Sequence, residues 1–113
     1  MTNLAQKKCV ACEGFETPFN EVEANVLMRQ VPGWELGGDA KNISRTFKFK
    51  NFAEALAFTN NVGEIAESEG HHPDIELSWG RVGINLTTHA IKGLSENDFI
   101  LAAKINETAD ARV

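Results

Sequence analysis

Residues 51–89 decide the fold, and they read NFAEALAFTNNVGEIAESEGHHPDIELSWGRVGINLTTH. Their first part predicts a helix that begins after Asn51, because Asn51 and Glu54 have the spacing of an N-cap residue and an N3 carboxylate. Gly70 predicts the end of this helix, since glycine favours the left-handed conformation just past a C-terminus. Apolar residues recur between these ends at spacings of three and four, as one buried helix face requires; they are Phe52, Ala55, Phe58, Val62 and Ile65.

The second part of this stretch predicts a β-hairpin. Apolar and polar residues alternate over 74–79 and again over 81–87, which is typical of strands with one buried face. Because burial fixes the register, the apolar residues of both strands must share one face of the sheet. The tightest connection that satisfies this condition is a Gly80-Arg81 turn with Trp79 opposite Val82. Trp79 is then a core aromatic at the end of its strand.

The residues on either side of this stretch complete the fold. A second capping pair predicts a helix over residues 20–30, and alternating polarity predicts strands at 34–36 and 43–50. Ser95 and Asp98 form a third capping box ahead of a last amphipathic helix. The predicted class is α+β, in the order α-β-β-α-β-β-α. Its helices pack on one face of a four-stranded antiparallel sheet, whose other face is polar or meets another subunit.

Length and composition limit the class of protein. The 113 residues suffice for one domain and exclude a two-domain enzyme with a separate cofactor domain. A hydrophobic content of 42% and a charged content of 24% are typical of a soluble globular protein. The formal net charge of -5 argues against direct nucleic acid binding, because phosphate contacts require clustered Lys and Arg.

The first residues show no helical or strand periodicity. We therefore expect residues 1–19 to be a flexible or loosely packed N-terminal lead-in, followed by a single domain over 20–113. No apolar run has the length of a signal peptide or a membrane span, so a cytoplasmic protein without membrane association is expected. Cys9 and Cys12 are interpreted as incidental reduced thiols, because a zinc ribbon needs a second pair and a thioredoxin-like site needs a preceding strand.

All three histidines of the chain lie between positions 71 and 89. Extending the predicted hairpin register places His89 opposite His72, with His71 at the exit of the preceding helix. Glu67 lies four residues before His71, so its carboxylate is expected to orient that imidazole from the same helix face. Three imidazoles and one acid are thus predicted to converge.

Such a cluster can be a set of structural histidines, a metal site or an acid–base site. Zinc prefers three or four His, Cys or carboxylate ligands, but adjacent His71 and His72 tend to point apart on an extended segment. The spacings H-x3-H and H-E-x2-H are also absent from the sequence. Imidazole has an unperturbed pKa of about 6.5 and exchanges protons near neutrality. Acid–base chemistry is therefore preferred over metal binding.

These residues also resemble the signature of a known family. The pattern comprises Glu67-x3-His71-His72-Pro73, Trp79, His89 and Asp98, and it is similar to that of the pterin-4a-carbinolamine dehydratases. The segment Gly93-Leu94-Ser95-Glu96 and the helix over 52–70 resemble the same family. The resemblance covers roughly residues 20–105, and the cysteine-containing lead-in resembles that of bacterial members.

The resemblance implies a hydro-lyase that converts a 4a-hydroxytetrahydropterin to quinonoid dihydropterin and water, without a cofactor. This substrate forms when an aromatic amino acid hydroxylase oxidises its pterin cofactor, so a functional link to such an enzyme is implied. By position, His71 and His89 become the acid–base groups, while His72 mainly positions the pterin. The other implied site residues are Glu67, Pro73, Thr88 and Asp98.

The resemblance also bears on assembly. It implies a homodimer or a homotetramer. Because relatives in animals bridge the dimerisation helices of a transcription factor, a non-catalytic interaction or coactivator module of the same fold is the alternative function. Asn97 stands where some relatives carry Arg, and Ile75 stands where some carry an aromatic residue. Substrate affinity or assembly is therefore expected to differ from that of those relatives.

Overall fold

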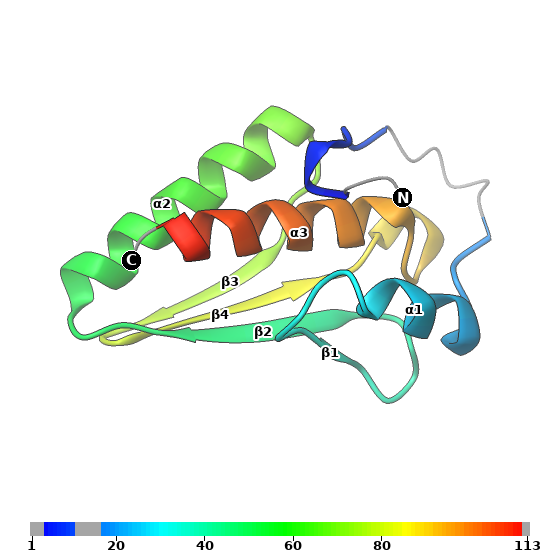
Figure 1. The fold of residues 1–113 in the computed structure, drawn as a ribbon, viewed down its shortest axis with the longest axis horizontal. Helices are drawn as coiled ribbons and strands as arrows, with labels where there is room; N and C mark the ends of the chain where they lie inside the picture. The colour runs from blue at the N-terminus through cyan, green and yellow to red at the C-terminus, as the bar shows by residue number, and fades with distance from the viewer. Residues whose placement is uncertain (1–3, 11–16, 112–113) are drawn as a thin grey trace.

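The computed structural model describes residues 4–10 and 17–111 (Figure 1). The predicted order of three helices and four strands is confirmed, and two short 3-10 helices are added. In chain order the elements are η1 (Leu4–Gln6), α1 (Glu21–Met28), β1 (Glu35–Leu36), β2 (Ile43–Lys48), α2 (Phe52–Glu69), β3 (Asp74–Ser78), β4 (Arg81–Leu86), η2 (His89–Ile91) and α3 (Glu96–Ala111).

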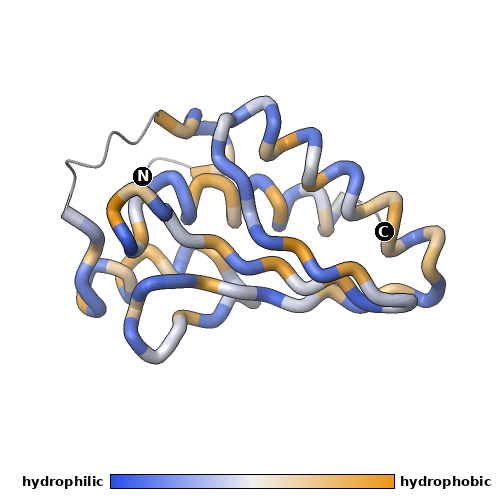
Figure 2. Tube along the Cα trace, turned by 180° about the vertical axis from the view of Figure 1, so that it is seen from behind, coloured by the Kyte–Doolittle hydropathy of each residue, from blue (hydrophilic) through white to orange (hydrophobic). Residues whose placement is uncertain are grey.

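The four strands form one antiparallel sheet in the order β1-β2-β4-β3. Helices α2 and α3 pack against each other and lie on the same side of this sheet, while α1 lies beside β1 (Figure 1). Apolar and polar residues alternate along the strands, so only one side of the sheet contributes to the core (Figure 2). The predicted α+β class is thus confirmed.

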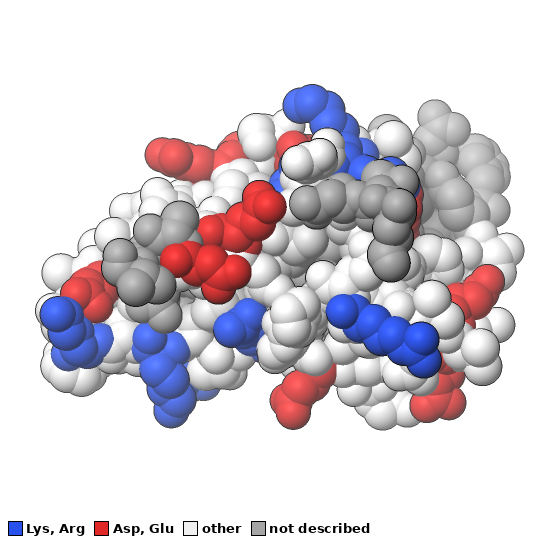
Figure 3. Space-filling view, viewed as in Figure 1, with Lys and Arg blue, Asp and Glu red and all other residues white. Residues whose placement is uncertain are grey.

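The core lies between the sheet and the two long helices. Phe47 from β2 and Phe58 from α2 meet with their ring centroids 4.8 Å apart, and α3 buries Phe99 against Phe19 at 6.0 Å. Charged side chains of both signs are intermixed on the face shown in Figure 3. Among the helices in residues 4–10 and 17–111, none has the length and apolar character needed to cross a bilayer.

The predicted caps of the first two helices are present. Asn20 and Glu23 form a complete capping box at α1, with side-chain to backbone bonds of 2.8 and 2.9 Å. At α2, the side chain of Asn51 accepts the backbone N–H of Glu54 at 2.8 Å. Gly70 ends α2 in the left-handed conformation, with a φ of 65°. These local signals therefore fix where α2 ends and where the histidine segment begins.

The register of the second hairpin differs from the prediction by two residues. Leu77, and not Trp79, lies opposite Val82, so the turn is Trp79-Gly80. A shift of two residues keeps the same side chains on the buried face, and alternation alone therefore cannot detect it. Gly80 fits tightly here, because an added Cβ would lie 2.8 Å from the carbonyl oxygen of Phe49. Trp79 is 68% exposed at the turn, so its predicted core position is wrong.

The shifted register also changes the prediction for His89. The ladder between β3 and β4 ends at the pair Asp74 and Asn85. Beyond it the chain leaves the sheet, and His89 begins the 3-10 helix η2. The predicted cross-strand pairing of His89 with His72 is therefore wrong.

The Pro32-Gly33 turn requires glycine at its second position. The φ of Gly33 is +90°, and an added Cβ would lie 2.6 Å from Cζ of Arg45. That guanidinium packs over the Phe47 ring, 4.4 Å from its centroid, and donates to the carbonyl oxygen of Pro32. We expect Gly33→Ala to lower the free energy of unfolding by about 2 kcal/mol, because backbone strain and a steric clash coincide.

Gly38→Ala is the matched control in urea denaturation. Gly38 has no positive φ, and an added Cβ would meet nothing within 4 Å. We expect its free energy of unfolding to stay within about 0.5 kcal/mol of the wild-type value. Equal stability of the two alanine variants would contradict this account of the Pro32-Gly33 turn.

Candidate active site

The centre of the candidate site is a pair formed by His71 and Asp98. His71 directly follows the left-handed Gly70, and its Nε2 lies 2.6 Å from Oδ1 of Asp98. The imidazole is 12% exposed, whereas the carboxylate is fully buried. Because a carboxylate accepts hydrogen bonds, Nε2–H is the donor, and Nδ1 is the ring nitrogen left to exchange a proton.

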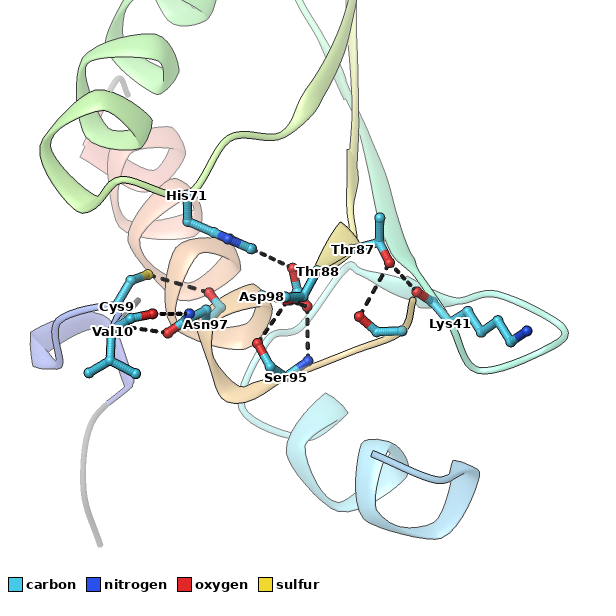
Figure 4. Close-up of polar contacts among 10 residues, drawn as sticks. Cys9, Val10, Lys41, His71, Thr87, Thr88, Ser95, Asn97 and Asp98 are labelled. Atoms are coloured by element: carbon cyan, nitrogen blue, oxygen red, sulfur yellow. Dashed lines mark hydrogen bonds and ion pairs between the residues drawn. The ribbon is translucent and has the colours of Figure 1, made fainter. Parts of the chain in front are cut away.

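Two further groups donate hydrogen bonds to the Asp98 carboxylate (Figure 4). Its Oδ2 accepts the hydroxyl of Thr88 at 2.7 Å and the backbone N–H of Ser95 at 3.0 Å. The hydroxyls of Thr88 and Ser95 are also 2.8 Å apart. Asp98 lies in the first turn of α3, where the helix dipole favours a negative charge. Both carboxylate oxygens are thus oriented by hydrogen bonds.

The segment between β4 and α3 carries His89, and it is attached to this pair through the preceding residue, Thr88. Thr88 and Gly93 form an antiparallel bridge that closes the loop around η2. Thr87 ties the same loop to the β1–β2 connection, because its hydroxyl donates to the carbonyl oxygen of Lys41 at 2.6 Å. His89 follows Thr88 directly and is exposed. The carboxylate that holds His71 therefore also holds the residue before His89.

The structure corrects the role predicted for Glu67. Its Oε2 lies 3.3 Å from Nε2 of His72, and both side chains are exposed at the surface. His71 pairs with Asp98 instead, because the left-handed Gly70 turns the chain out of the helix and the i, i+4 spacing no longer applies. The two adjacent histidines thus contact different carboxylates, as expected for side chains that point apart.

The structure therefore brings only part of the predicted set into direct contact. His71, Thr88 and Asp98 form one hydrogen-bonded group, whereas His72 and Glu67 form a separate exposed pair. Ser95 was predicted only as a helix cap, and its contact with Thr88 was missed because sequence spacing does not show that Thr88 lies beside it. Pro73 is half-buried directly before β3. Within residues 4–10 and 17–111, no three His, Cys, Asp or Glu side chains form a group that could hold a metal ion.

The described part of the N-terminal lead-in is packed, which differs from the predicted loose segment. Leu4 and Ala5 are buried in the core, and the Lys104 ammonium donates to the carbonyl oxygen of Ala5 at 2.7 Å. The segment lacks periodicity because its polar contacts come mainly from its backbone. Cys12, the second residue of the predicted thiol pair, lies outside the described residues.

Cys9 in this segment is predicted to be unreactive. Burial, with a smaller contribution from the negative charge of Glu69, raises the pKa of its thiol to about 12. The thiolate is the nucleophile, and a raised pKa makes it scarce at neutral pH. In a Cys12→Ser variant, we expect iodoacetamide to alkylate Cys9 at pH 8 at least a hundredfold more slowly in the folded than in the urea-unfolded protein. Equal rates in the two states, measured by mass spectrometry, would contradict the prediction.

Comparisons with known proteins identify the family. Residues 17–108 match the model described as pterin 4 alpha carbinolamine dehydratase. A relative from Methylococcus capsulatus, assigned by name to the pterin-4-alpha-carbinolamine dehydratases, is 50% identical over 95% of this chain and 94% of its own.

Solved structures show the same fold. The "transcriptional coactivator/pterin dehydratase" from Brucella melitensis is 34% identical, has a TM-score of 0.78, and matches over 82% of this chain and 99% of its own. A pterin dehydratase-like protein described as a RuBisCO assembly factor in the alpha-carboxysome has a TM-score of 0.59 at 24% identity, over 68% of this chain and 89% of its own. By sequence and by fold, the chain belongs to the pterin-4-alpha-carbinolamine dehydratase family.

Proposed function

We propose that the protein converts a 4a-hydroxytetrahydropterin to quinonoid dihydropterin and water. The observation that carries the proposal is the His71–Asp98 pair, in which a fully buried carboxylate lies 2.6 Å from an imidazole that keeps 12% of its surface exposed. An oriented, accessible imidazole is what proton transfer to a bound small molecule requires.

The reaction needs one acid and one base. The C4a–O bond breaks as the leaving hydroxyl gains a proton, the N5–H bond loses its proton, and a C4a=N5 double bond forms with release of water. His71 and His89 are proposed to supply these two groups, in either order. Imidazole suits both roles because its two protonation states are close in free energy near neutral pH.

Asp98 and Thr88 are proposed to prepare His71 and the substrate pocket for this step. The Asp98 carboxylate accepts Nε2–H of His71 and so favours one tautomer and one ring orientation. Thr88 fixes the other carboxylate oxygen and begins the loop that carries His89. Pro73 is proposed to shape the pocket, since it leads from the histidines into β3.

His72 is proposed to position the pterin. Its imidazole is exposed and lies 3.3 Å from the equally exposed Glu67 carboxylate. Exposed polar groups beside a reactive pair can hydrogen-bond a heterocyclic substrate without taking part in proton transfer. Glu67 is accordingly proposed to act on His72 and the substrate.

The direct test is a stopped-flow assay of the wild-type protein. We expect the decay of 4a-hydroxytetrahydropterin to accelerate in proportion to protein concentration, with quinonoid dihydropterin as the product. Treatment with a chelator followed by elemental analysis tests the proposed metal-free mechanism. A stoichiometric metal whose removal abolishes the activity would contradict that mechanism, and a decay rate equal to the buffer control would contradict the function.

The cellular setting is proposed on the same basis. The substrate would come from an aromatic amino acid hydroxylase, and the reaction would return its pterin to the cofactor cycle in the cytoplasm. The protein is proposed to form a homodimer or homotetramer. Light scattering coupled to size-exclusion chromatography would reveal the assembly state.

A non-catalytic interaction module is the second candidate. It is supported by the Brucella melitensis relative, whose description names it both a transcriptional coactivator and a pterin dehydratase. The exposed side chains of Phe52 and Leu56, four residues apart on α2, would suit contact with a partner helix. A wild-type protein that leaves the pterin unchanged but forms a stable complex with another protein would favour this candidate.

A further inference from the structure

We propose that residues 4–10, here called the N-terminal strap, position the two elements that carry the His71–Asp98 pair. The strap binds the first turn of α3, where Asp98 lies, and the last residue of α2, from which the chain leads to His71. The proposal rests on the proposed function and names Asn97 and Glu69 as positioning residues. Among the described residues, the polar partners of these two side chains are Cys9, Val10 and Lys104, and none of them is a histidine.

The strap contacts α3 at several points, which include the Lys7–Glu96 ion pair, and beside Asp98 the contact is made through the side chain of Asn97. Its Oδ1 accepts the backbone N–H of Val10 at 2.9 Å, and its Nδ2 donates to the carbonyl oxygen of Val10 at 2.6 Å (Figure 4). The Cys9 thiol also lies 3.6 Å from the carbonyl oxygen of Asn97. Asn97 is 5% exposed and directly precedes Asp98. The strap therefore holds the chain at the residue next to the carboxylate.

The contact with α2 is made through Glu69. Its Oε1 accepts the backbone N–H of Cys9 at 2.8 Å, and its Oε2 lies 3.8 Å from Nζ of Lys104 on α3. The Glu69 side chain is only 7% exposed. Glu69 is the last residue of α2 and lies two residues before His71. Consecutive strap residues, Cys9 and Val10, thus bind the two helix ends from which the pair projects.

Leu4 and Ala5 of the strap pack into the core, whereas its contacts with Glu69 and Asn97 are hydrogen bonds, which fix position. The Val10 side chain is 72% exposed, so at this point the strap contributes backbone hydrogen bonds and no apolar packing. Apolar contacts between α2 and α3 are non-directional, whereas a hydrogen bond of 2.6 Å depends on atomic positions within a fraction of an ångström. Directional bonds from the strap add a positional constraint to the helix packing and to the Glu69–Lys104 ion pair.

The test compares Asn97→Ala with Asn106→Ala on the same helix. Asn106 is also buried, but it bonds Trp34, Arg45 and Pro32, away from the strap. Both variants are expected to unfold at lower urea concentration, because each leaves buried polar groups unpaired. Only Asn97→Ala is expected to lower kcat, by about tenfold with a smaller change in KM, since its effect is on geometry.

The second readout does not depend on activity. The proton on Nε2 of His71 should give a downfield NMR signal that persists because Asp98 accepts it in a largely buried site. We expect Asn97→Ala to broaden this signal through exchange with water and Asn106→Ala to leave it unchanged. A sharp wild-type signal in Asn97→Ala, or equal broadening in both variants, would overturn the strap proposal.

A second variant keeps the test open if Asn97→Ala fails to fold. Val10→Pro removes the backbone N–H that Asn97 accepts, at a residue whose side chain is exposed, and it also restricts the backbone of Cys9 and Val10. It should broaden the His71 signal as Asn97→Ala does, and an unchanged signal would again overturn the proposal. If the wild-type protein does not dehydrate the pterin, the proposed function fails, and the NMR signal alone decides on the strap.

Discussion

Replacing either His71 or His89 with alanine is expected to lower the rate of 4a-hydroxytetrahydropterin dehydration by about a hundredfold or more. This is the scale for a positioned acid or base, and each variant removes one of the two groups that the reaction needs. The effect should appear in kcat, because the lost interaction is with protons that move in the transition state. Stopped-flow measurement at saturating substrate is the direct check.

His72→Ala is the matched control for these two variants. His72 is exposed and pairs with Glu67, and neither side chain contacts the Asp98 carboxylate. We expect a higher KM and less than about a tenfold change in kcat, since a positioning contact acts mainly on binding. Wild-type dehydration rates in both His71→Ala and His89→Ala would contradict the assignment of these two histidines as the acid and the base.

Replacing Asp98 with asparagine is expected to reduce both activity and stability. Oδ1 of Asp98 accepts from His71, and Oδ2 accepts from Thr88 and from the backbone N–H of Ser95. An amide has only one oxygen, so the Asn side chain would present its NH₂ group either to His71 or to Thr88 and Ser95. A donor would then face a donor in a buried site. We expect the free energy of unfolding to fall by about 2–3 kcal/mol and the rate of dehydration to fall by about a hundredfold.

Asp110→Asn is the control for this substitution. Asp110 is exposed near the other end of α3, so the same chemical change is made on the same helix away from the site. We expect the free energy of unfolding from urea denaturation to stay within about 0.5 kcal/mol of the wild-type value. The stopped-flow dehydration rate should stay within about twofold of the wild-type rate. If Asp98→Asn matches this control in both measurements, the carboxylate does not organise the site.

The fold could be predicted because its signals are local. Asn51 and Gly70 mark the ends of α2 through backbone geometry that depends on the residues themselves. The alternation in β2, β3 and β4 determines which face of each strand is buried. Side-chain chemistry at such positions acts over a few residues, so it can be recognised without knowing the rest of the structure.

The hairpin register could not be predicted from the same signals. Alternation fixes only which residues share a face, and registers two residues apart satisfy it equally. The close approach of Gly80 to the Phe49 carbonyl favours the observed turn, and that contact comes from a distant strand end. Trp79 was consequently placed in the core, whereas it lies exposed at the turn.

The candidate site could be predicted in composition but not in its pairing. The spacing of the histidines and Asp98 predicted a set of residues, of which His71, Thr88 and Asp98 form one hydrogen-bonded group. The partner of His71 depended on the left-handed conformation of Gly70, which turns the imidazole away from Glu67 and toward α3. The contacts of the N-terminal strap with Glu69 and Asn97 were missed because they use backbone groups of the strap, which leave no pattern in the sequence.

The central claim is that two imidazoles catalyse the dehydration, and the double variant His71→Ala/His89→Ala tests it most directly. Its rate of 4a-hydroxytetrahydropterin decay should be measured by stopped-flow, beside the wild-type protein and a buffer control, after circular dichroism has verified the fold. Because groups that act as a unit have non-additive effects, we expect the double variant to be within about tenfold of the slower single variant and near the buffer rate. A folded double variant that retains the wild-type rate would contradict the claim.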